Sequence, residues 1–142
     1  MCLRTTENIK IAQEDIKCYK VVLHSNHKDK WRGLFKYNNK TFDFNKVLIN
    51  KERKCVRIEN WCSGDVNFAV EKGYFHSFKL LIDADRLYRN TKLCPYDYLE
   101  TKQMARHYRI ELVECIIPKG SEYFENSGYY ASDKIILTYS HG

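Results

Sequence analysis

The chain has 142 residues, of which 44% are hydrophobic and 14% aromatic, and it carries 24 lysines and arginines against 18 aspartates and glutamates. This aromatic content excludes a disordered chain, and the 6 glycines and 2 prolines are too few for a collagen-like or low-complexity sequence. No apolar run approaches the roughly 20 residues that a membrane-spanning helix needs. The composition therefore predicts one domain with a buried core.

The first half of the chain reads as strands. Residues 1–14 are expected to form a lead-in segment, and 16–23 (IKCYKVVL) is rich in the β-branched and aromatic residues that strands favour. Further strands are predicted over 31–37, 41–48, 55–58 and 73–78.

The second half combines helices and strands. Leu81, Ala84, Leu87 and Tyr88 recur at helical spacing, which predicts a short amphipathic helix over 81–88, and a second helix is predicted over 96–107. The run 109–117 (RIELVECII) is apolar on both faces, as in a central strand. Shorter strands over 121–124 and 134–139 complete a single α+β domain around a mixed or antiparallel sheet.

The positive charge belongs to one segment. Between Lys20 and Arg57 there are 11 basic residues against 3 acidic ones, a net charge of 11 − 3 = +8, whereas the whole chain carries +6. Such asymmetry favours a face that meets a polyanion or an acidic protein surface. The alternative is a lysine-rich exterior that contacts only water.

Basic and aromatic residues alternate within this segment. Cationic side chains bind phosphates and aromatic rings stack on unpaired bases, so the pattern predicts contact with RNA or DNA, or with a host protein or protein–RNA complex. Simple amphipathic alternation, with the aromatic rings inward, explains the same pattern. The predicted contact residues are Lys28, Lys30, Trp31, Arg32, Lys36, Lys40, Arg53, Lys54 and Arg57.

The six cysteines suggest a reduced, cytoplasmic protein. No apolar leader segment precedes them, and Cys18 and Cys115 lie in apolar runs, so both are expected to be small core residues. A zinc site can be drawn from His24, His27, Cys55 and Cys62, but the spacing is not that of a usual knuckle, so no metal is predicted.

His76 and Ser77 do not make a catalytic dyad, because neighbouring residues of a strand point to opposite faces. His76 is expected to be a half-buried histidine.

Two stretches, GYFHSFKLLIDADRLY and RIELVECIIPKGSEYFENSGYYASDKIIL, resemble small proteins of phages and mobile elements of the Bacteroidetes group. The similarity covers most of the chain, including IAQEDIKCYKVV. It implies an accessory protein that acts by binding in the host cytoplasm. An inhibitor of a host defence nucleoprotein, of the anti-CRISPR kind, would suit a basic face, and a phage structural or assembly factor is the plainer possibility.

The last third of the chain also resembles ADP-ribosyltransferase folds, more faintly. That likeness implies an enzyme that uses NAD, with Arg32 (or His24), Ser77 and Asp133 as the matched catalytic residues. The family's glutamate is replaced here by Asp133, which is shorter by one methylene, and a shift of about 1 Å can cost roughly 100-fold in rate. The resemblance therefore supports the fold more than the enzyme, and no cofactor is predicted under the binding hypothesis.

Overall fold

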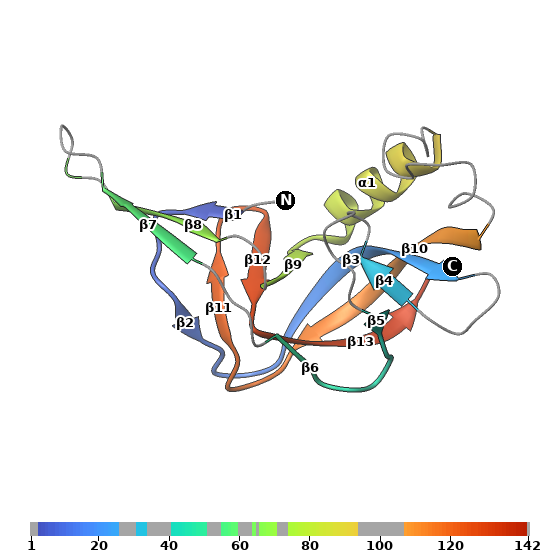
Figure 1. Ribbon diagram of the computed structural model, residues 1–142, viewed down its shortest axis with the longest axis horizontal. Helices are drawn as coiled ribbons and strands as arrows, with labels where there is room; N and C mark the ends of the chain where they lie inside the picture. Colours follow the sequence, from blue (N-terminus) through green and yellow to red (C-terminus); the bar gives the residue numbers. More distant parts are fainter. Residues whose placement is uncertain are drawn as a thin grey trace.

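The structure is a computed structural model that describes residues 3–25, 31–33, 41–50, 55–59, 64, 66–70, 74–93 and 107–141. Within these ranges the protein has an α+β fold in which antiparallel strands dominate and one helix is present (Figure 1), as predicted. The strands are β1 (Leu3–Thr5), β2 (Lys10–Ile11), β3 (Ile16–Ser25), β4 (Trp31–Gly33), β5 (Thr41–Phe42), β6 (Leu48–Ile49), β7 (Cys55–Glu59), β8 (Val66–Val70), β9 (Phe75–Phe78), β10 (Tyr108–Ile117), β11 (Glu122–Glu125), β12 (Tyr129–Ser132) and β13 (Lys134–Ser140). The helix is α1 (Leu81–Leu93).

The described strands form two sheets. The larger follows the order β2-β11-β12-β9-β3-β10-β13-β6, with β4 paired to β3 and β5 paired to β4. The smaller follows the order β1-β8-β7 and projects from one end of the molecule (Figure 1). Each pair of named strands is antiparallel.

The centre of the larger sheet is the long pair β3–β10, which stays in register from Tyr108 opposite Ser25 to Ile117 opposite Ile16. Both faces of β10 are buried, because Ile110 and Leu112 pack beneath α1 while the alternating residues enter a second core on the other face. This confirms the central strand predicted from its two apolar faces.

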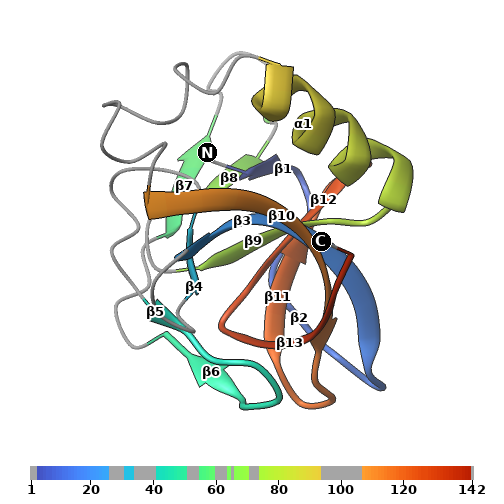
Figure 2. The ribbon, with the colours of Figure 1, turned by 90° about the vertical axis from the view of Figure 1, so that its right-hand side faces the viewer.

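The larger sheet bends back on itself. Only Asp133 separates β12 from β13, yet β12 pairs with β9 and β13 pairs with β10 (Figures 1 and 2). The succession β12, β9, β3, β10, β13 therefore returns to its start and encloses an inner core. Its buried members are Cys18, Val22, Trp31, Phe75, Val113, Cys115, Ile117, Ile135 and Leu137.

The helix α1 covers the outer face of β3 and β10 (Figure 2) and is longer than predicted, since it continues past Tyr88 to Leu93. Thr91 lies in the added turn, where its side chain is fully buried and its hydroxyl donates to the carbonyl of Leu87 at 2.7 Å. The second predicted helix falls almost wholly on residues 94–106, outside the described part of the chain.

Several predicted boundaries are wrong. The single strand expected over 41–48 is interrupted at Asn45, whose φ of 56° is a turn conformation, and it becomes β5 and β6. The segment 3–14 is more than a lead-in, since β1 and β2 lie in it and Leu3 is 2% exposed. The strands β8 and β12 were not predicted.

Candidate binding surface

The tryptophan of the basic segment, Trp31, lies in β4 and is 7% exposed. It stands directly opposite His24 of β3, and the two rings stack with 3.8 Å between centroids and 3° between planes. Phe44 packs on it at 4.3 Å between centroids. The ring therefore belongs to the inner core and holds β4 on the sheet, as amphipathic alternation requires. Little of the Trp31 ring is accessible for stacking on an unpaired base.

The basic residues expected to bind a partner are divided between two places. Arg32 lies in β4 opposite Leu23, whereas Arg57 lies in β7 of the smaller sheet. Figure 1 shows β4 and β7 well separated along the longest axis of the molecule. The Arg57 side chain is 61% exposed and pairs with Glu59 at 3.1 Å. The remaining predicted residues fall outside the described part: Lys28, Lys30, Lys36, Lys40, Arg53 and Lys54.

One cation counted in the basic segment, Lys20, lies inside the protein. Its side chain is buried, and its Nζ donates a hydrogen bond to the carbonyl of His76. Burial lowers the pKa of Lys20, because the charged ammonium is poorly solvated there. Lys20 therefore has a structural role, and any surface charge of the segment comes from its other lysines and arginines.

A buried carboxylate lies next to the stacked rings. Glu111 Oε1 is 2.9 Å from His24 Nδ1 and accepts from Arg109 Nε at 2.5 Å. Its other oxygen, Oε2, accepts from the hydroxyl of Ser140 at 2.6 Å. Burial by itself would raise the pKa of Glu111, but these hydrogen bonds outweigh it and lower the pKa. The Glu111 carboxylate and Arg109, whose Nη2 lies 2.7 Å from His24 Nδ1, hold His24 against Trp31 and so support the pairing of β3 with β4.

The residues matched to ADP-ribosyltransferases have contacts of a structural kind. Asp133 is 7% exposed, and its Oδ1 accepts the backbone N–H of Glu122 at 2.9 Å, which fixes the corner between β12 and β13. Ser77 is 1% exposed, and its hydroxyl helps to lower the pKa of the buried Cys18 thiol. His24 is engaged by Trp31 and Glu111. The use of NAD stays a prediction.

The structure does not show the four residues considered for a zinc site close to one another. His24 lies in the larger sheet and Cys55 in the smaller one, while His27 and Cys62 fall outside the description. Within the described ranges, no three histidine, cysteine, aspartate or glutamate side chains lie close enough to hold a metal ion.

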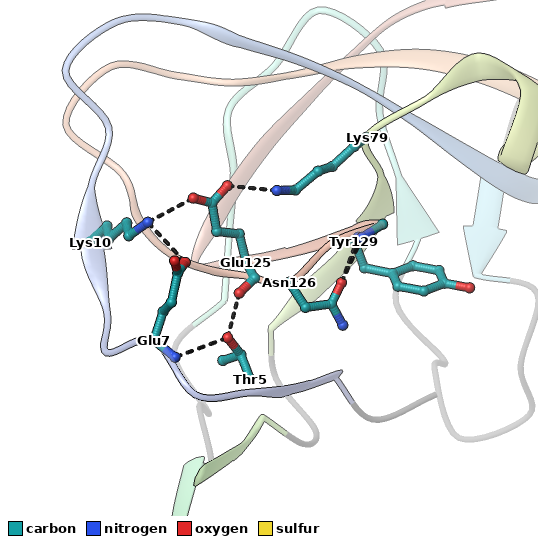
Figure 3. A network of polar contacts seen from close by, with 8 residues as sticks. Thr5, Glu7, Lys10, Lys79, Glu125, Asn126 and Tyr129 are labelled. Atoms are coloured by element: carbon teal, nitrogen blue, oxygen red, sulfur yellow. Dashed lines mark hydrogen bonds and ion pairs between the residues drawn. The ribbon is translucent and has the colours of Figure 1, made fainter. Parts of the chain in front are cut away.

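A polar pocket that the sequence did not predict lies where β1 meets the β11–β12 turn. Its volume is about 510 Å³, and Arg4, Glu7, Lys79 and Glu125 contribute to its lining. Figure 3 shows the Glu125 carboxylate between two ammonium groups, with Lys10 at 2.7 Å and Lys79 at 2.9 Å. Lys10 also reaches Glu7 at 2.9 Å.

This network ties distant parts of the chain together. Burial alone would raise the pKa of Glu125, but the hydrogen bonds from Lys10 and Lys79 outweigh it and lower the pKa. The backbone supports the arrangement, because β2 pairs with β11 and the N–H of Lys79 donates to the carbonyl of Gly128 at 3.0 Å. No local sequence pattern predicts this network, because its charged residues come from three separate segments of the chain.

Comparison of the chain with protein-family models, curated proteins and solved structures gives no match. Both resemblances described above therefore stay predictions. Among the described residues, no helix has the length and apolar character needed to cross a membrane.

Proposed function

We propose that the protein is an accessory binding protein that attaches through its basic segment to a host defence nucleoprotein and inhibits it, in the manner of an anti-CRISPR protein. The observation that carries this proposal is the net charge of +8 between Lys20 and Arg57 in a chain whose total is +6. The partner's matching feature is an exposed stretch of RNA backbone or an acidic groove.

The packing around β4 supports this proposal. Trp31 is held between His24 and Phe44, and the register of β4 with β3 is fixed over three consecutive residue pairs. The backbone of β4, which includes Arg32, is therefore held in place, and a binding residue on a rigid strand loses less conformational entropy when it associates.

The charge distribution supports it as well. Two cations of the segment with described side chains, Lys46 and Arg57, are exposed to solvent. Lys20 is the exception, because it is buried. Its burial takes one positive charge away from the surface, but most of the excess positive charge of the segment is left.

The test measures whether the purified protein inhibits target cleavage by a guide-RNA-loaded CRISPR effector. The variant reverses four charges of the segment: Lys28→Glu, Lys30→Glu, Arg32→Glu and Lys36→Glu. The matched control reverses four exposed cations outside the segment, namely Arg86→Glu, Arg89→Glu, Lys92→Glu and Lys119→Glu. Both variants change the net charge equally, so a difference between them reports the position of the charges.

We expect the segment variant to lose inhibition while the control variant keeps most of it, with both chains folded by circular dichroism. Equal inhibition by the segment variant and the native chain would remove the basis of the proposal. So would no inhibition of any guide-loaded effector by the native chain.

A further inference from the structure

Two cysteines face each other across the central strand pair. Cys18 of β3 and Cys115 of β10 are direct partners in the antiparallel register, and both are fully buried in the inner core. Directly opposite residues of antiparallel strands have Cα atoms about 4.5 or 5.5 Å apart, depending on the type of pair. Both values fall inside the range of about 4.4–6.8 Å that disulfides occupy. The backbone therefore already holds this pair at disulfide distance.

The two thiols also interact with each other. Hydrogen bonding with Cys115 lowers the pKa of the Cys18 thiol against the opposing effect of burial, and the Ser77 hydroxyl and the Lys20 amino group act in the same direction. Burial raises the pKa of Cys115. The sulfur of Cys18 thus has the greater thiolate character, and thiolate is the form that oxidants attack.

We propose that Cys18 and Cys115 form an intramolecular disulfide when the protein meets hydrogen peroxide, so that the central strand pair is a site of oxidative modification. The Cys18 thiolate attacks one peroxide oxygen, the O–O bond breaks, and a sulfenic acid and hydroxide result. The hydroxide takes a proton and becomes water. The sulfur of Cys115, having lost its proton, then attacks the sulfenic sulfur, the S–S bond forms, and the S–O bond breaks to release a second water. The two sulfurs together supply the two electrons that reduce the peroxide.

The bond would be reversible and slow to form. The pairing of β3 with β10 keeps the two cysteines opposite each other, and thiol–disulfide exchange with an added dithiol opens such a bond again. Both thiols are shielded from solvent, whereas Cys55 is exposed, so Cys55 reacts with peroxide first. The bond lies wholly within the chain, so it forms whether or not the partner proposed above exists.

The test treats the full native chain with hydrogen peroxide for increasing times, removes the peroxide with catalase, and unfolds the chain in N-ethylmaleimide. Peptide mass spectrometry then identifies each alkylated, oxidised or cross-linked cysteine. Cys115→Ala removes one partner, and Cys55→Ala is the matched control that removes a cysteine elsewhere. The disulfide is detected in the native chain, so a folding defect in Cys115→Ala would not affect that result.

We expect a cross-linked peptide pair containing Cys18 and Cys115 that appears after Cys55 has been oxidised. The pair should disappear on reduction with dithiothreitol, persist in Cys55→Ala and be absent from Cys115→Ala. Recovery of both core thiols in alkylated form, at exposures that have fully oxidised Cys55, would overturn the proposal. A bond from Cys18 to any cysteine other than Cys115 would overturn it as well.

Discussion

The substitution Trp31→Ala should destabilise the protein by about 3–5 kcal/mol. Trp31 is 7% exposed and lies between His24 and Phe44. Aromatic side chains bury about 150–250 Å², which at about 25 cal/mol per Å² corresponds to about 4–6 kcal/mol of transfer free energy. That figure is an upper bound, because the unfolded chain already buries part of the ring. Truncations of buried tryptophan or phenylalanine to alanine cost about 3–5 kcal/mol.

Urea unfolding followed by circular dichroism measures this loss. The matched control is Tyr139→Ala, which removes an aromatic ring that is 58% exposed and should cost less than about 1 kcal/mol. Trp31→Phe should fall between the two, because it keeps a ring between His24 and Phe44. If Trp31→Ala costs less than about 1 kcal/mol yet weakens partner binding, then Trp31 is a surface contact and its assignment to the core is wrong.

Three further outcomes test the polar interior. Glu125→Gln should cost about 1 kcal/mol at pH 7, because it removes partly exposed ion pairs with Lys10 and Lys79. Folding lowers the pKa of Glu125, so the stability that it contributes is present above its ordinary pKa of 4.5 and is lost in more acidic solution. A difference in stability between the native chain and Glu125→Gln that persists unchanged at pH 2 would contradict this. Burial lowers the pKa of His76 from 6.5 to about 4, so the native stability should fall by about 3 kcal/mol as the pH drops through that range, and His76→Gln should flatten the slope. An equal slope in the variant would exclude His76 as its source. Ser77→Ala should change the stability by less than about 1 kcal/mol, because the buried hydroxyl makes no hydrogen bond of ordinary geometry and interacts only weakly with the Cys18 thiol. A loss of several kcal/mol would contradict this.

The sequence predicts the central strands well because their pattern is local. In β10 the apolar residues occupy both faces over ten residues, and only a strand buried on both sides satisfies them. The burial of Cys18 and Cys115 was predicted for the same reason and is confirmed, as is the partial burial of His76.

The bend that closes the larger sheet could not be predicted in this way. It depends on Asp133, whose carboxylate accepts the N–H of Glu122, and on β12, a strand of four residues with no periodic pattern. The strand β1 gains its stability from pairing with β8, more than 60 residues away in the chain, so no short window of sequence reveals it.

The candidate site shows the same division between local and distant information. The alternation of Trp31 with basic residues was visible in the sequence, but it fitted two interpretations, nucleic-acid contact and simple amphipathic alternation. The structure assigns the ring to the core because His24, fixed by Glu111 from β10, covers one of its faces. The Glu125 network was missed because Lys10, Lys79 and Glu125 meet only after the sheet has formed.

The measurement that tests the central claim most directly is the salt dependence of binding to an immobilised guide-RNA-loaded CRISPR effector. If Lys28, Lys30, Arg32 and Lys36 contact RNA phosphates, their joint reversal should lower the steepness of log K against log salt by about 2.8, which is four contacts at about 0.7 each. The control reversal at Arg86, Arg89, Lys92 and Lys119 should leave the steepness unchanged. Equal slopes for the native chain and the segment variant, or an equal fall in both variants, would contradict binding through the basic segment.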